Sequence, residues 1–142
     1  MAIIANRPRL RRTLSAVGAA IAVSSGMLAG VSAPAYAANP YTAKGVCGSG
    51  YTVQRSHKLP GATTYQLYNG TTTCVVTLKT ASLGKATKVT AGLRVTGGSW
   101  AYNTGAYTYY AGPVKQRSKG KCVRYFGYSR GSNFTSTWAN CG

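Results

Sequence analysis

Few side chains in this 142-residue sequence could do chemistry, and none is acidic, because the sequence contains no aspartate and no glutamate. This absence excludes glycosidases with paired carboxylates, carboxylate-bound Ca²⁺ or Mg²⁺ sites, and Ser-His-Asp triads. His57 is the single imidazole, and a histidine without a carboxylate or a second histidine beside it is a poor general base. We therefore expect no catalytic residue, no enzymatic activity and no cofactor.

Cysteine is the other reactive side chain. Four cysteines occur, at Cys47, Cys74, Cys122 and Cys141. An even number of cysteines in a short exported chain predicts two disulfides. Three pairings are formally possible, and we expect the sequential one, Cys47–Cys74 and Cys122–Cys141, because it leaves short loops. A zinc site is the competing interpretation. We expect no metal site, because the sequence has no C-x-x-C pair and only His57 as a further ligand.

Residues 1–37 have the features of an export signal. A basic n-region precedes a weakly apolar stretch, and Ala35-Tyr36-Ala37 then supplies a small-x-small cleavage site. A transmembrane helix is the less favoured alternative, because the apolar stretch contains serine and glycine. We expect a cleaved signal peptide over 1–37, followed by a single secreted domain over 38–142 without a transmembrane segment.

Positive charge dominates the expected secreted domain. Of the 17 lysine and arginine side chains, the four arginines of the n-region precede residue 38, which leaves 13. Six of the 13 fall within 16 residues, at Lys115, Arg117, Lys119, Lys121, Arg124 and Arg130. Phe126 and Tyr128 are interleaved with them as a candidate aromatic platform. We expect this segment to bind polyanions, including nucleic acid without sequence specificity. A solvated basic hairpin with core aromatics is the alternative.

A two-residue turn at Lys119-Gly120 would make this basic segment a hairpin. The turn places Lys115 opposite Arg124, with Arg117 on the same face. Like charges directly opposite one another destabilise a hairpin, so a bound anion would stabilise this one.

A second aromatic group precedes the basic segment. It comprises Trp100, Tyr102, Tyr107, Tyr109 and Tyr110. Such rings can stack on sugar rings or bases, or they can fill the core of a small β domain.

The elements that must position these residues are strands, because helix signals are nearly absent. Asn69-Gly70 is the strongest hairpin signal, and a two-residue turn there would pair Tyr65 with Cys74 in a half-buried ribbon. Residues 88–96 alternate between apolar and polar side chains. The expected strands are Tyr51–Leu59, Thr63–Tyr68, Thr71–Thr80, Lys88–Thr96, Ala106–Lys115, Lys121–Tyr128 and Asn133–Ala139. These six or seven strands predict a compact antiparallel all-β domain, with a sandwich and a barrel both open.

Several short segments, in order along the expected domain, carry a family resemblance. They are Gly45-Val46-Cys47-Gly48-Ser49-Gly50-Tyr51, Tyr68-Asn69, Cys74-Val75-Val76-Thr77, Tyr109-Tyr110-Ala111-Gly112-Pro113-Val114, Gly120-Lys121-Cys122-Val123 with Tyr125, and Cys141-Gly142. The set resembles the spore-associated protein A family, small secreted proteins of filamentous soil bacteria. The resemblance implies an extracellular protein associated with spores or aerial growth, without established enzymatic activity.

Three functions are compatible with these features. The first is a non-enzymatic, secreted, spore- or cell-surface-associated cationic protein that binds anionic cell-wall or spore-surface polymers. The second is a secreted cationic antimicrobial protein that acts on foreign membranes or walls. The third is a small protease inhibitor that presents Arg117 or Lys119 on a tight loop. We favour the first because its cations have no acidic partners within the chain.

Overall fold

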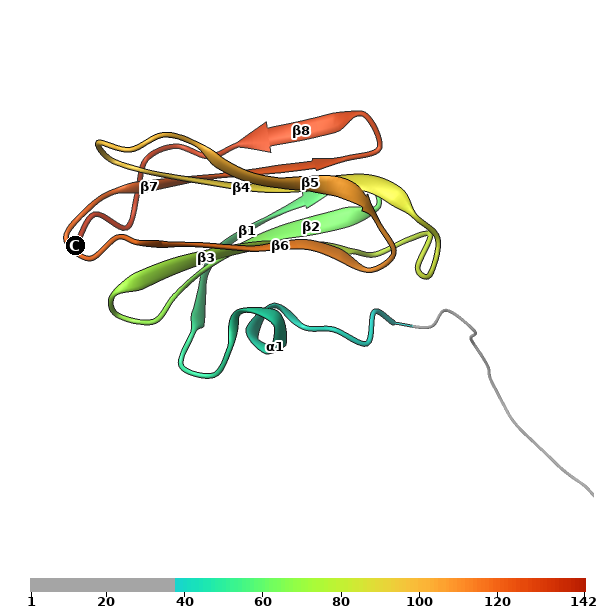
Figure 1. Ribbon diagram of the computed structural model, residues 1–142, viewed down its shortest axis with the longest axis horizontal. Coiled ribbons are helices and arrows are strands. Elements are labelled where there is room, and N and C mark those ends of the chain that lie inside the picture. The colour runs from blue at the N-terminus through green and yellow to red at the C-terminus, as the bar shows by residue number, and fades with distance from the viewer. Residues whose placement is uncertain (1–37) are drawn as a thin grey trace, which may run out of the picture. The chain divides into compact units, whose positions relative to one another are not determined.

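The computed structural model describes residues 38–142 (Figure 1), so the signal peptide expected over residues 1–37 lies outside the described residues. Within residues 38–142 the chain forms, in order, α1 (Ala43–Cys47), β1 (Thr52–Leu59), β2 (Ala62–Tyr68), β3 (Thr72–Lys79), β4 (Thr87–Val95), β5 (Ala101–Tyr107), β6 (Tyr110–Arg117), β7 (Val123–Ser129) and β8 (Ser132–Thr135). The strands make two antiparallel sheets, sheet A with the order β1-β2-β3-β6 and sheet B with the order β5-β4-β7-β8. The expected all-β fold is confirmed, as a sandwich of eight described strands.

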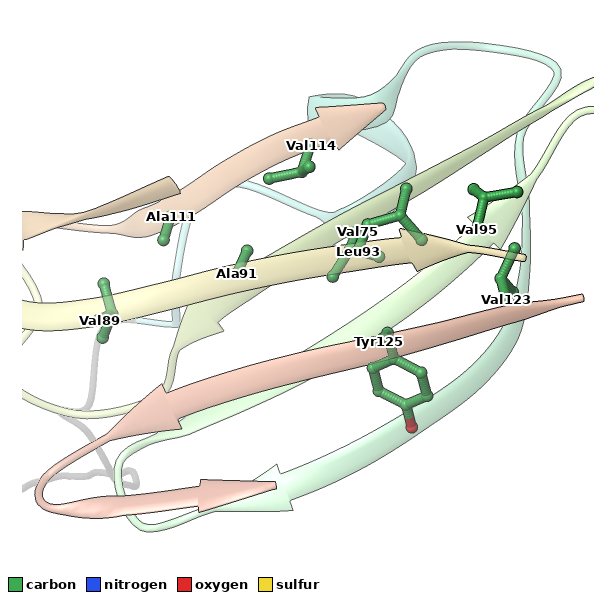
Figure 2. Close-up of a cluster of buried hydrophobic side chains, with 9 residues drawn as sticks. All are labelled: Val75, Val89, Ala91, Leu93, Val95, Ala111, Val114, Val123 and Tyr125. Atoms are coloured by element: carbon green, nitrogen blue, oxygen red, sulfur yellow. The ribbon is translucent and has the colours of Figure 1, made fainter. Parts of the chain in front are cut away.

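The main hydrophobic core lies between the two sheets. The alternation predicted for β4 is confirmed, because Val89, Ala91, Leu93 and Val95 are all buried. Figure 2 shows these side chains together with those that complete the cluster: Val75, Ala111, Val114, Val123 and Tyr125. The sandwich therefore buries one face of sheet B, and the opposite face of that sheet points away from this core.

The outer face of sheet A is covered by α1. The helix contacts the strands of sheet A, and its Cys47 is disulfide-bonded to Cys74 of β3. The sequential pairing is confirmed, because Cys122 and Cys141 form the second disulfide. Since β3 packs against sheet B on one side and α1 on the other, seven of its eight residues are buried. The expectation of a half-buried β2–β3 ribbon is therefore wrong.

The register of the β2–β3 hairpin also differs from the expected one. Leu67 lies opposite Cys74, so the register is shifted by two residues from the expected pairing of Tyr65 with Cys74. The turn is centred on Gly70-Thr71 rather than on Asn69-Gly70, because the Asn69 backbone N–H donates to the Thr72 carbonyl. The Asn69 side chain accepts hydrogen bonds from the backbone N–H groups of Thr71 and Thr72. A shift of two residues keeps every side chain on its predicted face, since strand side chains alternate with a period of two.

Two further expectations about strands are wrong. The segment expected as a single strand, Ala106–Lys115, is divided between β5 and β6. The hairpin expected at Lys119-Gly120 does not form, because β6 pairs with β3 in sheet A whereas β7 pairs with β4 in sheet B. Lys115 accordingly lies opposite Cys74, and Arg124 lies opposite Arg94.

The turn between β6 and β7 carries the chain from sheet A to sheet B. Buried Ser118 shares a 2.6 Å hydroxyl–hydroxyl hydrogen bond with Thr73, and the backbone N–H groups of Ser118 and Lys119 both donate to the Thr71 carbonyl. These bonds tie the turn to the start of β3 in sheet A, so that β7 begins in the other sheet. Among the described residues, no helix has the length and apolar composition needed to span a bilayer.

Candidate polyanion-binding face

The outer face of sheet B carries cations and aromatic rings together. Sheet A lies between it and α1 (Figure 1), so within residues 38–142 no helix covers it. Residues of β4 and β7 that alternate with the core point outward here. We name this surface the basic–aromatic face; its residues are Lys88, Arg94, Trp100, Tyr102, Arg124, Phe126, Tyr128 and Trp138. Tyr102 is 53% exposed and Trp138 40% exposed, which are large values for aromatic side chains.

Aromatic rings occupy the centre of the basic–aromatic face. Trp100 stacks on Tyr102 with ring centroids 5.5 Å apart and an interplanar angle of 14°, and the Phe126 ring is nearly perpendicular to Tyr102 at 5.5 Å. Such stacked and edge-to-face arrangements are favourable aromatic geometries. Gly92 lies beneath, and a Cβ there would come within 2.7 Å of the Tyr102 ring. The glycine thus allows the Tyr102 ring to lie close against β4.

A shallow hollow adjoins these rings. It has a volume of about 310 Å³ and is lined by Lys88, Thr90, Tyr102, Thr104, Phe126 and Tyr128. The Lys88 Nζ atom lies 5.4 Å from the centroid of the Tyr128 ring, a cation–π distance. The hollow therefore combines a cation, hydroxyl groups and ring surfaces, which suits it to a polar, negatively charged chain.

An arginine pair lies at the other end of the basic–aromatic face. Arg94 and Arg124 are directly opposite one another on β4 and β7. Their Cζ atoms lie 5.7 and 5.5 Å from the centroid of the same Trp138 ring. Both Nε atoms donate to backbone carbonyls, Arg94 to Gly98 and Arg124 to Ser136, each at 3.0 Å. Each guanidinium group is thus held against the Trp138 ring.

The structure brings together only part of the predicted site. Arg124, Phe126 and Tyr128 lie on the basic–aromatic face, whereas Lys115 and Arg117 belong to β6 of sheet A. The Lys115 ammonium lies 5.1 Å from the Tyr51 ring centroid.

The other three predicted cations lie in turns. Lys119 and Lys121 are exposed between β6 and β7. Arg130, between β7 and β8, donates from Nη2 to the Ser82 hydroxyl at 3.1 Å. The six cations of the sequence cluster therefore do not form one surface.

Sequence reasoning missed Lys88, Arg94 and Trp138 as site residues. The signal for the first two was present, because the alternation of residues 88–96 puts both on the polar side of the strand. What the sequence did not show was that this strand pairs with the one containing Arg124.

The second aromatic group is divided between three places, one of which is the main core, where the half-buried Tyr107 packs. Trp100 and Tyr102 join the basic–aromatic face, whereas Tyr109 and Tyr110 pack against Tyr41 with centroid distances of 5.6 and 5.0 Å. The Asn39 side-chain amide donates to the carbonyls of Lys79 and Tyr109. Tyr109 and Tyr110 thus hold the segment before α1 against the turn between β5 and β6.

The buried Lys79 and the half-buried Arg55 of the edge strand β1 are both bound by neutral groups. Arg55 donates from Nε and Nη2 to the Gln66 side-chain oxygen at 2.9 and 2.7 Å, and its Cζ lies 5.0 Å from the Tyr125 ring centroid. Lys79 is only 1% exposed, and its ammonium donates to the carbonyls of Lys85 and Tyr107. Burial lowers the pKa of both side chains, and their positive charges have no carboxylate partner.

His57 lies two residues after Arg55 on β1. Its ring stacks on Phe134 with centroids 3.6 Å apart and an interplanar angle of 6°. Within residues 38–142, no three or more His, Cys, Asp and Glu side chains gather closely enough to hold a metal ion.

Fold and face together define a class of protein: a small, disulfide-bonded β-sandwich with one sheet face covered by its own chain and the other open, basic and aromatic. The sequence is 37% identical over 138 residues to spore-associated protein A of Streptomyces coelicolor, an alignment that covers 92% of this chain and 86% of the relative. The chain therefore belongs to the spore-associated protein A family, as the sequence resemblance implied. No protein-family model matches the sequence, and no solved structure matches it.

Proposed function

We propose that this protein is a non-enzymatic, secreted, cationic protein that associates with the spore or cell surface by binding anionic envelope polymers. One observation carries the proposal: the 13 lysine and arginine side chains of residues 38–142 have no side-chain carboxylate to neutralise them. The contacts that they make are with carbonyls, amides, hydroxyls and aromatic rings, for example at Arg55 and Lys88. Such contacts position a cation, but they do not neutralise its charge.

Neutralisation must therefore come from outside the chain. A polymer with regularly spaced negative charges satisfies several cations at once and releases the counterions of both partners. The basic–aromatic face is the best-suited surface, because it is open and has cations at both ends. The name of the Streptomyces coelicolor relative, spore-associated protein A, supports a spore surface as the place of attachment.

Salt dependence tests this proposal. Purified protein is bound to spores and to isolated cell walls, and the retained fraction is measured between about 50 and 200 mM salt. Retention should fall steeply over this range, because release of counterions makes polyanion binding depend strongly on salt. Retention that is equal at both ends of the range would contradict the proposal.

Two charge-matched triple variants test whether the face matters. Lys88→Gln/Arg94→Gln/Arg124→Gln removes three cations from the basic–aromatic face, and Lys115→Gln/Lys119→Gln/Lys121→Gln removes three from elsewhere. Both variants lose the same formal charge. The first should lose more retention at equal salt, with thermal unfolding showing that each variant is folded. Equal losses would support attachment by net charge and contradict a special role for this face.

The exposure of Tyr102 and Trp138 beside cations favours one competing function, a secreted cationic antimicrobial. Amphipathic aromatic rings suit the interface of an anionic membrane. Dye leakage from anionic vesicles at micromolar protein, together with growth inhibition, would support the antimicrobial function. Salt-sensitive retention on walls without leakage would support polymer binding instead.

A further inference from the structure

The arginine pair of the basic–aromatic face places two like charges where a sheet ordinarily avoids them. Arg94 and Arg124 are directly opposite on adjacent strands, where Cβ atoms are about 4.5–5.5 Å apart and like charges destabilise the pairing. The sequence contains no side-chain carboxylate that could relieve this repulsion. The pair is therefore a focused positive site on an otherwise diffusely basic protein.

Four contacts hold the pair in place. Both guanidinium groups lie over the Trp138 ring, and each Nε donates to its own backbone carbonyl, of Gly98 or of Ser136. Among residues 38–142, no protein acceptor takes a hydrogen bond from the Nη atoms of either arginine. The Nη donors of both side chains, which are only half-buried, are thus oriented by the protein and available to a ligand.

We propose that Arg94 and Arg124 form a binding site for the phosphoryl groups of a phosphate-bearing envelope polymer. The proposal rests on the proposed function and names the anionic group that this site recognises. Guanidinium forks bind oxyanions through paired, charge-assisted hydrogen bonds. The two oxygens of a planar carboxylate suffice for one fork, whereas a tetrahedral phosphoryl group directs its oxygens to different sides and can engage two forks that approach it from different directions.

The position of the arginine pair fits a chain with repeated phosphates. Lys88 lies six residues from Arg94 along β4, which corresponds to about 20 Å. A phosphate chain that is bound at the arginine pair can therefore cross the aromatic centre of the face and reach a second cation. Nucleic acid is also a phosphate chain, but its bases would contribute stacking on the rings, and this difference can be measured.

Charge-conserving substitutions test the site. Arg94→Lys and Arg124→Lys keep the charge but lose the planar fork, and Arg117→Lys on β6 is the matched control. Affinities are measured by calorimetry for poly(glycerol phosphate) and, as a carboxylate polymer, polygalacturonate. We expect each face variant to bind poly(glycerol phosphate) about tenfold more weakly than the unsubstituted protein, because the bidentate fork is lost. Polygalacturonate affinity, and all affinities of Arg117→Lys, should stay within about twofold.

A fluorescence titration tests the same site in a protein that keeps both arginines. In a Trp100→Phe variant, Trp138 is the remaining tryptophan, and inorganic phosphate should change its emission at concentrations where acetate does not. An equal response to phosphate and acetate would overturn the proposal, as would unchanged phosphate-polymer affinity in both Arg→Lys face variants.

The calorimetric outcomes also separate this proposal from the one on which it rests. If the unsubstituted protein binds both polymers in a salt-sensitive way and Arg94→Lys and Arg124→Lys have no effect, the phosphoryl site is wrong and the proposed function stands. If the unsubstituted protein binds neither polymer, the phosphoryl site and the proposed function are both wrong. A single-stranded oligonucleotide that binds more than tenfold tighter than poly(glycerol phosphate) of equal charge would overturn the envelope polymer as the occupant.

Discussion

At the scale of single residues, Lys79 places an ammonium group inside the protein without an anion. It is 1% exposed and is bound by two backbone carbonyls. Burial, and to a smaller extent the charge of Arg130, lower the pKa of Lys79 below its ordinary value of 10.5. Between the lowered pKa and the ordinary value, the unfolded chain binds more protons than the folded one, so the free energy of unfolding rises with pH there.

We therefore predict a pH-dependent difference between the protein and its Lys79→Met variant. As pH increases from 7 toward 10, the free energy of unfolding of the unsubstituted protein should increase relative to that of Lys79→Met, because the cost of burying the charge disappears. Urea unfolding at several pH values measures the difference. A difference that is constant across this range would show that Lys79 titrates alike in the folded and unfolded states.

Gly127 of β7 leaves no room for a Cβ against Thr64 of the opposite sheet. A Cβ at this position would lie 1.8 Å from the Thr64 Oγ1 atom and 2.8 Å from its Cβ, and Thr64 is fully buried. We predict that Gly127→Ala lowers the free energy of unfolding by about 3 kcal/mol, the upper part of the range for overpacked cores. Adding Thr64→Ala removes the nearest atom, so the double variant should lose less than the sum of both single losses. Additive losses in denaturant unfolding would contradict this explanation.

At the scale of elements, a strand was predictable where the alternation of its own side chains specified it. The alternation of β4 and the faces of β2 and β3 follow from side-chain order, which is local information. β5 was missed because Ala101–Tyr107 contains Asn and Gly, residues that are unfavourable in strands.

The candidate site depended on pairing, which is not local. The Lys119-Gly120 signal predicted a hairpin, but the contacts of Ser118 with Thr73 and of Lys119 with Thr71 bind the turn to a distant strand. The sequence therefore gave no means of placing Arg124 beside Arg94. Three of the eight predicted site residues lie on the basic–aromatic face because alternation put them on one side of β7.

The two disulfides connect different elements, and we predict that a reductant cleaves Cys122–Cys141 before Cys47–Cys74. Cys47 and Cys74 are 1% and 0% exposed between α1 and sheet A, whereas Cys141 is exposed and Cys122 half-buried. Thiol–disulfide exchange requires access to a sulfur atom. Dithiothreitol under native conditions, followed by alkylation and mass spectrometry, should label Cys122 and Cys141 first.

A control for the reduction experiment is the Cys122→Ser/Cys141→Ser variant. It should fold with the Cys47–Cys74 bond intact and lose about 3 kcal/mol of stability, as expected for a loop of about 20 residues. Labelling of Cys47 and Cys74 first in the unsubstituted protein would contradict the order derived from exposure.

At the scale of the whole molecule, the two outer sheet faces are used differently. The outer face of sheet A is closed by α1 and the Cys47–Cys74 disulfide, so that it adds a second apolar cluster to the fold. The outer face of sheet B keeps its rings and cations open. Stability and binding are thus divided between opposite sides of the sandwich, and changes to the basic–aromatic face should alter binding more than folding.

The missing carboxylates also affect the stability of the whole molecule. Acid unfolding of most proteins occurs because carboxylates that are paired or hydrogen-bonded in the folded state become protonated. Residues 38–142 contain no side-chain carboxylate, and their cations are already charged at neutral pH. Acidification therefore removes no side-chain ion pair within these residues.

We predict that the free energy of unfolding changes by less than about 1 kcal/mol between pH 7 and pH 2.5 at constant ionic strength, because no titration of a side-chain carboxylate is linked to folding. Urea unfolding followed by tryptophan fluorescence measures it, in chloride without phosphate, because phosphate itself changes charge over this range. A loss of several kcal/mol between pH 5 and pH 3 would mean that some other acid-sensitive interaction holds the sandwich together.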